Sequence, residues 1–265
     1  MKQTIMTLSK ALEVIDELAR SYEPVGVSDL SRRLGLTKNQ VFRVLKTLEE
    51  HDYVQQVGER YHLGLKFIEV GRKILSQNDL LQLAIAHLNE VRNATGESSV
   101  IFVLDGQEAV CIAVREGTGL MDITARVGLR YLLHAGAATK AILAFQPEDF
   151  VDAAIAKHGL PAYTRYTITD ADTLKLHLAA IREQGYVFSN EDVQVHASAV
   201  SVPIYDRDDY VRASMCVSGP NDRFTDEKRE QALAILAGIC DRISASLGSS
   251  IRPGAQIVLR DRAPV

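Results

Sequence analysis

The sequence predicts an α+β protein with two regions, and two observations support this class. Helix patterns and one short hairpin pattern fill the first 64 residues, whereas several strand patterns beyond residue 78 stand next to one another. Neighbouring strands with the helices grouped apart are typical of an antiparallel sheet in an α+β domain. We therefore expect a small N-terminal domain, residues 1–64, a linker, residues 65–77, and a larger domain, residues 78–250.

The composition is that of a folded globular protein. The 265 residues are 46% hydrophobic and 24% charged, which excludes a disordered or collagen-like chain. No apolar stretch approaches the ~18 residues of a membrane span, and the N-terminus lacks the apolar block of a secretory signal. We expect a cytoplasmic protein without a membrane partner.

The first 36 residues predict two helices. Apolar residues recur at helical spacing between Ser9 and Arg20, and the segment around Pro24 ends this pattern. Ser28 is a favourable N-cap for a second helix, and Gly35 is a favourable C-terminal cap at its end. The second helix is therefore expected to be barely two turns long.

A third helix follows after a very short turn. Thr37 and Gln40 have the spacing of a capping box, in which each side chain binds the other residue's free backbone N–H. The apolar face of this helix consists of Val41, Val44, Leu45 and Leu48. Its opposite, polar and basic face consists of Asn39, Arg43 and Lys46. A short helix, a tight turn and a longer helix predict a helix-turn-helix.

A hairpin and a fourth helix follow. The strand patterns 53–57 and 60–63 flank Gly58 and Glu59 and predict a short hairpin, which would be the wing of a winged helix-turn-helix. Apolar residues then recur at helical spacing over residues 65–76. We expect this segment to form a linker helix.

The region beyond residue 78 predicts two strand pairs and five helices. The expected helices cover residues 80–95, 139–145, 147–157, 172–184 and 225–247, and the expected strands cover residues 100–104, 109–114, 199–205 and 211–217. Asp105-Gly106 is a strong hairpin signal between the first two strands. Residues 251–265, with two prolines and a glycine, predict a flexible tail.

Positive charge is concentrated in residues 28–46. The whole chain has a formal net charge of −4, which argues against a protein coated in positive charge for nucleic acid. Asp29 is the one anion of this segment, and its five cations are Arg32, Arg33, Lys38, Arg43 and Lys46. A solvated helix face is one explanation of such charges. The preceding tight turn and the following wing favour the other explanation, a DNA-binding helix.

The exposed side of the third helix predicts specific contacts with duplex DNA. Arginine can read guanine and asparagine can read adenine in the major groove, so Arg43 and Asn39 are the predicted base readers. The residues predicted to contact phosphates are Thr37, Lys38, Lys46 and, on the wing, Arg60. The predicted DNA-binding set is completed by Ser28, Gln40 and Phe42.

No metal site, cofactor or catalytic residue is predicted. Cys111, Cys216 and Cys240 are widely spaced without a C-x-x-C pair, and the seven histidines form no H-x-x-H or HExxH pattern. The serines lack a G-x-S-x-G elbow, and there is no G-x-x-x-x-G-K-[ST] nucleotide loop. We expect His134 and His196 to be satisfied by backbone groups.

Small residues cluster in three segments of the second region, residues 134–140, 189–192 and 214–220. Small side chains can reflect close packing. They can equally line a cavity whose hydroxyls and free backbone donors hold a small anion. The residues alone leave both explanations open.

The chain resembles the IclR family of bacterial transcription regulators over residues 4–250. Residues 34–45 are similar to the family's recognition-helix segment, and residues 61–64 to the end of its wing. Three hallmark segments of the second domain are similar to HAGAATKAILAF from His134, GYVFSNED from Gly185 and CVSGPNDRF from Cys216. The resemblance implies a winged helix-turn-helix, a linker helix and a GAF-like effector domain that binds small organic acids or aromatic compounds. It also implies homodimers, often paired into tetramers.

By this resemblance, the effector pocket includes Ala137, Ala138, Ser189, Ala199, Cys216 and Ser218. The chain departs from the family pattern at several positions. Thr139 and His196 replace common glycines, Ser189 stands where an acidic residue is frequent, and Gln40 replaces the commoner Thr or Ser. The first three departures bear on the identity of the effector, and the last on the base contacts.

We therefore expect an effector-responsive DNA-binding regulator, a repressor of a small-molecule catabolic or transport operon, without a catalytic step. Its partners would be double-stranded operator DNA, a small effector and further copies of the chain. Two alternatives are an enzyme that acts on a small organic acid and a ligand-independent regulator of the same fold. In the second alternative, side chains such as His196 would fill the pocket.

Overall fold

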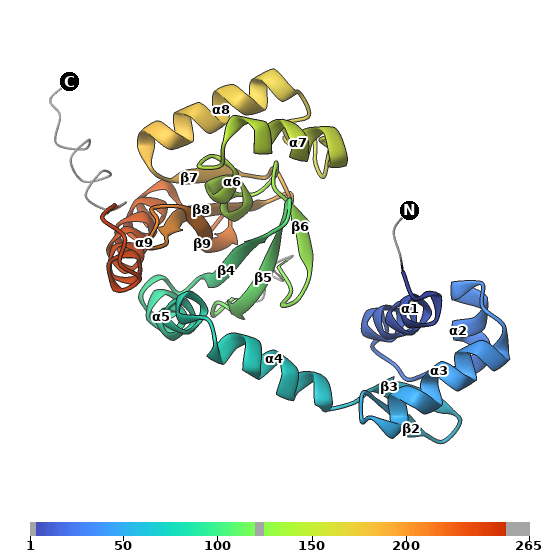
Figure 1. Ribbon diagram of the computed structural model, residues 1–265. Coiled ribbons are helices and arrows are strands. Elements are labelled where there is room, and N and C mark those ends of the chain that lie inside the picture. Colours follow the sequence, from blue (N-terminus) through green and yellow to red (C-terminus); the bar gives the residue numbers. More distant parts are fainter. Residues whose placement is uncertain (1–3, 120–124, 253–265) are drawn as a thin grey trace, which may run out of the picture. The chain divides into compact units, whose positions relative to one another are not determined.

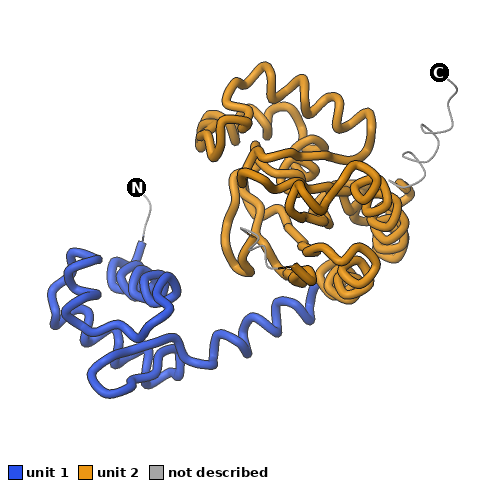
Figure 2. The backbone as a smooth tube through the Cα atoms, turned by 180° about the vertical axis from the view of Figure 1, so that it is seen from behind, with its two compact units in different colours: residues 1–78 blue, residues 79–265 orange. Residues whose placement is uncertain are grey.

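The computed structural model describes residues 4–119 and 125–252. The chain forms two compact units, residues 1–78 and residues 79–265, which Figure 2 shows in different colours. Most of the predicted tail, residues 253–265, lies outside the described residues. Among the helices of the described residues, none is long and apolar enough to cross a membrane.

The described residues of the N-terminal unit form four helices and a small antiparallel sheet (Figure 1). Its elements are α1 (Met6–Arg20), β1 (Val25–Gly26), α2 (Val27–Leu34), α3 (Lys38–Glu50), β2 (Val54–Val57), β3 (Arg60–Leu63) and α4 (Lys66–Ser76). The sheet has the order β1-β3-β2, and Tyr61 of its central strand is buried among apolar residues of all three preceding helices. This arrangement is the predicted winged helix-turn-helix, with one short strand, β1, that was not predicted.

Local sequence signals determine the ends of α2 and α3. Gly35 adopts the left-handed conformation, with φ of 65°, that ends α2. The predicted capping box starts α3: the backbone N–H of Gln40 donates to Thr37 Oγ1 at 3.3 Å, and that of Thr37 to Gln40 Oε1 at 3.1 Å. The prediction of Ser28 as an N-cap is wrong. Strand β1 continues directly into α2, so Gly26 is the N-cap and Ser28 lies in the first turn.

The C-terminal unit is built on a six-stranded sheet. Its elements are α5 (Asp79–Thr95), β4 (Ser98–Asp105), β5 (Glu108–Arg115), β6 (Arg130–Leu132), α6 (Ala137–Leu143), α7 (Glu148–His158), α8 (Ala171–Gln184), β7 (Val187–Asn190), β8 (Ala197–Tyr205), β9 (Val211–Pro220) and α9 (Asp226–Ser246). The strand order is β6-β5-β4-β9-β8-β7, and every neighbouring pair is antiparallel. The predicted antiparallel sheet is confirmed, and the two edge strands, β6 and β7, are additions to it.

Helices cover both faces of this sheet (Figure 1). α5 and α9 lie on one face, and α6, α7 and α8 lie on the other. Alternate residues of β4 follow this division: Ser99 donates its hydroxyl to the carbonyl of Leu88 in α5, whereas Val100 and Phe102 are buried in the cluster formed with α6 and α8. Strand residues that point toward α6 are therefore the ones that can line a cavity beneath this helix.

Candidate nucleic-acid interface and ligand cavity

The exposed face of α3 carries most of the predicted DNA-binding set. The exposed residues on this helix and at its start include Thr37, Lys38, Asn39, Gln40, Phe42, Arg43 and Lys46. Its buried residues are Val41, Val44 and Leu45. Within the described ranges, no ion pair involves Lys38 or Arg43. Both cations are therefore available to a polyanion.

The two arginines of α2 are paired with acidic side chains. Arg32 Nη2 lies 2.7 Å from Asp29 Oδ1, and Arg33 Nη1 lies 2.9 Å from Glu17 Oε1 in α1. The hydrogen bond from Arg33 lowers the pKa of Glu17, which is therefore ionised at neutral pH. The positive surface is narrower than the count of cations in the sequence suggests, and it is centred on the first half of α3.

Lys46 connects the recognition helix to the wing. Its Nζ lies 2.6 Å from Glu49 Oε2 and 2.9 Å from Gln56 Oε1 in β2. The hydrogen bond to Glu49 raises the pKa of Lys46. Tyr61 Oη also donates to Gln56 Oε1, and Gln56 Nε2 donates to the carbonyl of Gly58 in the wing turn. Glu49 therefore offsets the charge of Lys46, and two of the three N–H donors of its ammonium are already used.

Two residues of the predicted DNA-binding set, Arg60 and Ser28, lie outside α3. Arg60 Nη1 donates to the carbonyl of Pro24 at 3.1 Å, so this guanidinium ties the wing to the segment before β1. Ser28 is exposed in the first turn of α2. The structure therefore groups the α3 residues of the predicted set and places these two on neighbouring elements.

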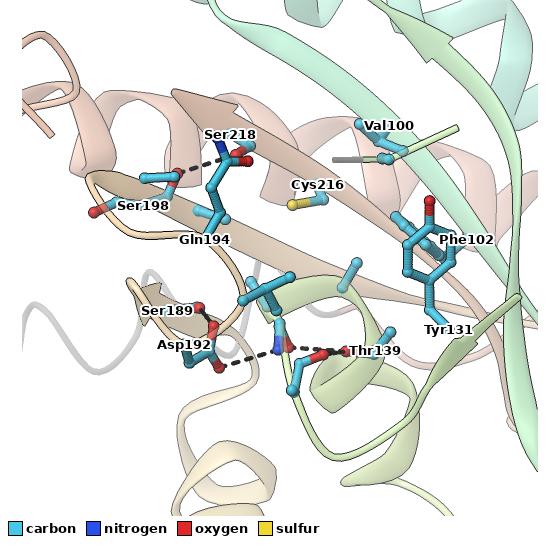
Figure 3. Close-up of a pocket in the computed structure, with 18 residues that line it drawn as sticks. Val100, Phe102, Tyr131, Thr139, Ser189, Asp192, Gln194, Ser198, Cys216 and Ser218 are labelled. Atoms are coloured by element: carbon cyan, nitrogen blue, oxygen red, sulfur yellow. Dashed lines mark hydrogen bonds between the residues drawn. The ribbon is translucent and has the colours of Figure 1, made fainter. Parts of the chain in front are cut away.

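A cavity of about 100 Å³ lies in the C-terminal unit beneath the start of α6 (Figure 3). All six residues predicted for the pocket line it: Ala137, Ala138, Ser189, Ala199, Cys216 and Ser218. The lining also includes residues outside the predicted set, among them Val100, Phe102, Tyr131, Asp192, Gln194 and Ser198. His196 is not among the residues that line the cavity, and its side chain is 87% exposed.

The register of the sheet brings the predicted residues together. Ser189 of β7 is opposite Ala199 of β8, which is opposite Ser218 of β9, so the three form one cross-strand row. Cys216 is opposite Val100 of β4, one row further along. Burial raises the pKa of the Cys216 thiol to about 12, so it remains protonated at neutral pH. This part of the cavity wall therefore consists of apolar side chains, two hydroxyls and a protonated thiol.

Among the described residues that line the cavity, Asp192 is the charged one. Lys140 Nζ of α6 lies 2.6 Å from Asp192 Oδ2, and the two side chains are only 4% and 8% exposed. The N–H of Gly136 donates to the same oxygen at 3.0 Å, and Ser189 Oγ donates to Oδ1. Burial alone would raise the pKa of Asp192, but Lys140, Ser189 and Gly136 outweigh it and lower this pKa.

Gly136 is required at the turn before α6. Its φ is 95°, a conformation that residues with a side chain rarely adopt, and its N–H points at the Asp192 carboxylate. A Cβ atom here would meet Thr139 Oγ1 at 3.2 Å and Val193 at 3.3 Å. This backbone geometry positions the first turn of α6 at the cavity.

His134, next to the cavity, is bound by the protein through one ring nitrogen. His134 Nε2 lies 2.9 Å from the carbonyl of Pro161, and its ring stacks on that of Tyr163. Burial lowers the pKa of His134, so it is neutral at pH 7. The expectation of a backbone partner is confirmed for His134. It is wrong for His196, whose side chain is 87% exposed and whose Nδ1 lies 3.7 Å from Glu191 Oε1. In residues 4–119 and 125–252, no group of three or more His, Cys, Asp or Glu side chains could hold a metal ion.

These two units define a class of protein. A winged unit that exposes uncompensated cations on its recognition helix is suited to the major groove of duplex DNA. A cavity lined by apolar groups and a few polar ones is suited to a small ligand. The class is therefore a DNA-binding regulator with a ligand-binding unit.

Comparison with known proteins identifies the family. Residues 7–58 match the IclR helix-turn-helix domain, and residues 72–245 match the C-terminal domain of the bacterial transcriptional regulator IclR. The chain therefore belongs to the IclR family.

Two transcription regulators of Escherichia coli are similar in sequence over nearly the whole chain. The transcriptional regulator KdgR of Escherichia coli K12 is 30% identical over 92% of this chain and 94% of its own length. The transcriptional repressor AllR of the same strain is 30% identical over 93% of this chain and 92% of its own length.

Solved structures share the architecture. The crystal structure of Thermotoga maritima IclR is 32% identical, with a TM-score of 0.78 over 92% of this chain and 99% of that chain. An IclR homolog from Microbacterium hydrocarbonoxydans, complexed with 4-hydroxybenzoate, is 21% identical and has a TM-score of 0.80 over 91% of this chain and 98% of that chain. Because its identity is only 21%, the similarity to the Microbacterium hydrocarbonoxydans structure concerns the fold alone.

Proposed function

We propose that this IclR-family regulator is a cytoplasmic repressor that binds operator DNA through α3 and is controlled by a small effector in the cavity beneath α6. The observation that supports DNA binding best is the exposed, capped start of α3, where Lys38 and Arg43 have no acidic partner within the described residues. Its targets would be genes for the uptake or breakdown of a small molecule. No catalytic step is part of the proposal.

The residues of α3 take different roles in this proposal. Arg43 and Asn39 read base edges, and Phe42 lies beside them as an exposed apolar group that suits a thymine methyl. Lys38 and Thr37 bind phosphates at the start of the helix. Gln40 acts through the capping box rather than through DNA.

A second copy of the chain is the proposed partner of the N-terminal unit. α1 exposes an apolar stripe of Ile5, Leu8 and Leu12, whose spacing places them on one side of the helix. α4 exposes a further apolar set that includes Leu65, Ile68 and Ile74. Exposed apolar patches of this kind mark interaction surfaces. A homodimer presents two recognition helices, which must lie about 34 Å apart to enter successive major grooves.

Control by the effector follows from linkage. A ligand shifts the equilibrium between two arrangements of the dimer only by the difference in its affinities for them. Domain boundaries at residues 64, 77 and 250 fit this scheme, because α4 then connects the DNA-binding domain to the effector-binding domain. An arrangement that changes the spacing of the recognition helices would release the operator.

Footprinting on the DNA upstream of the gene tests the proposal. We expect two protected half-sites whose centres are one helical turn, or a multiple of it, apart. A variant with Leu12→Glu should lose the paired protection, because the charge disrupts the apolar stripe of α1. Absence of any protected region, with wild-type protein at low salt, would contradict the proposed function.

A further inference from the structure

The wing has few buried residues to hold it beside α3. In β2 only Val54 is buried, whereas Gln55, Gln56 and Val57 are exposed. The backbone of β2 pairs with that of β3, and the turn between the strands contains Gly58, with φ of 61°. A two-stranded hairpin is at best marginally stable by itself in water. Side-chain contacts with the rest of the unit are therefore important for the position of this hairpin.

Gln56 links the wing to α3 through one amide group. Its Oε1 accepts hydrogen bonds from Lys46 Nζ of α3 at 2.9 Å and from Tyr61 Oη of β3 at 3.1 Å. Its Nε2 donates to the carbonyl of Gly58 in the wing turn at 2.7 Å. The amide thus acts as acceptor and donor at once, which only a glutamine or asparagine side chain can do with two separate atoms. Helix α3, strand β3 and the wing turn meet at this single side chain.

Lys46 is held in place from several sides. Its Nζ lies 2.6 Å from Glu49 Oε2, and it lies 5.8 Å and 5.9 Å from the ring centroids of Phe42 and Tyr61. A cation within about 6 Å of a ring centroid is attracted to the ring. The hydrogen bonds to Glu49 and Gln56 and the two rings together determine where this ammonium lies.

Lys38 and Arg43 differ from Lys46 in this respect. Neither has an acidic partner in the part of the chain that the structure describes, and both are exposed. A phosphate bound by Lys38 or Arg43 would break no ion pair. A phosphate bound by Lys46 would compete with Glu49 for the same ammonium. The contacts of Lys46 are those of a group that fixes the wing turn relative to the recognition helix.

We infer that Lys46 and Gln56 are positioning residues for operator binding, which hold the wing beside α3, and that Lys46 does not bind a phosphate; this rests on the proposed binding of operator DNA by the N-terminal unit. A wing that is already held in one position loses less conformational freedom when DNA binds, so the affinity is higher. Lys46 also lies over Phe42, the exposed apolar group of α3, and restrains this side chain as well.

The salt dependence of operator affinity separates the two possible roles of Lys46. A residue that binds a phosphate contributes about 0.9 to the slope of log affinity against log salt. A positioning residue lowers the affinity by the same factor at every salt concentration when it is removed. We expect Lys46→Met to bind the DNA upstream of the gene about fivefold more weakly, with an unchanged slope, in fluorescence anisotropy from about 50 to about 200 mM salt.

Three further variants of the full chain complete this series. Gln56→Leu should behave like Lys46→Met, and the double variant should bind within about twofold of either, because both changes remove the same set of contacts. Gln55→Leu is the matched control: Gln55 is exposed on the same strand and makes no side-chain hydrogen bond within the described residues, so this variant should bind like the wild type. Lys38→Met is the control for a phosphate contact and should reduce the slope by about 0.9.

Hydrogen exchange of the chain without DNA gives a second readout. Lys46→Met and Gln56→Leu should speed the exchange of the amides in residues 54–63 and leave that of α1 unchanged. A residue that only binds phosphate would not affect the exchange of the wing. If Gln56→Leu does not fold, Lys46→Met decides alone, because its side chain is 45% exposed and both the slope and the exchange are measured on it.

Four results would overturn the inference. They are a slope reduced by about 0.9 in Lys46→Met, unchanged exchange of the wing in this variant, a folded Gln56→Leu that binds as tightly as the wild type, and independent effects that multiply in the double variant. A wild type without preference for the DNA upstream of its gene would instead contradict the proposed function. The exchange of the wing would still test whether Lys46 and Gln56 hold it.

Discussion

The buried pair of Lys140 and Asp192 gives the sharpest stability prediction. Lys140→Met removes the ammonium, and a carboxylate remains that is only 8% exposed. Removal of one partner of a buried ion pair costs about 3–5 kcal/mol. Asp192 keeps hydrogen bonds from Gly136 and Ser189, so we expect the lower end, about 3 kcal/mol. For a unit of this size, this corresponds to a fall in Tm of about 6–12 °C.

The stability difference between Lys140→Met and the wild type should depend on pH. In the wild type the pKa of Asp192 is lowered, so its stabilising contribution is present above the ordinary pKa and is lost as the pH falls through the folded value. In Lys140→Met, the hydrogen bonds from Gly136 and Ser189 remain but the cation no longer opposes burial, so the pKa of Asp192 is higher than in the wild type. The folded variant then binds a proton more readily than the folded wild type. Its stability deficit should therefore shrink between pH 7 and pH 5.

Thermal and urea unfolding followed by circular dichroism measure both quantities. Lys175→Met is the matched control, because Lys175 pairs with Asp152 at 2.6 Å on an exposed surface and its loss should not shift the transition measurably. A Lys140→Met variant as stable as the wild type at pH 7 would refute the reasoning. So would a deficit that grows as the pH falls from 7 to 5.

Further predictions concern the N-terminal unit. Arg43→Ala should weaken operator binding by about 1–3 kcal/mol and relax the base preference in a gel-shift series, and unchanged affinity and preference would contradict its role. Lys38→Ala should reduce the slope of log affinity against log salt by about 0.9 without changing the preference, whereas an unchanged slope would argue against a phosphate contact. Thr37→Ala should destabilise the unit by about 1 kcal/mol in urea unfolding, with the exposed Thr47→Ala as control; equal effects of the two would exclude the capping box as the cause. Leu12→Glu should disrupt the proposed dimer interface on α1, so the variant should sediment as a smaller species than the wild type at the same concentration. Identical sedimentation of the two proteins would place the interface elsewhere.

Features that depend on near neighbours in sequence are predictable. The capping box of Thr37 and Gln40, the left-handed Gly35 and the two faces of α3 all follow from spacings of three or four residues. The Ser28 cap fails because a non-local contact, the pairing of β1 with β3, determines where α2 begins. A two-residue strand leaves no periodic pattern that could have indicated it.

Contacts between residues that are distant in the sequence could not be predicted from local patterns. The resemblance to a family indicated six residues of the cavity wall, but Asp192 was not among them. Its importance comes from Lys140, which lies on a different element and is brought to it by the packing of α6 against the sheet. The hydrogen bond from Lys46 to Gln56 was not predicted for the same reason, because it joins helix α3 to strand β2 through tertiary packing. For Asp192, the signal in the sequence was the cluster of small and polar residues at 189–192, which did not reveal its pairing with Lys140.

The most direct test of the account is the affinity of the purified chain for the DNA upstream of its gene, measured by fluorescence anisotropy against a scrambled fragment of equal length and composition across a salt series. The account predicts a preference of at least about a thousandfold at physiological salt, which Arg43→Ala largely removes. Equal affinities for the two fragments at every salt concentration, with and without small-molecule effectors, would contradict it.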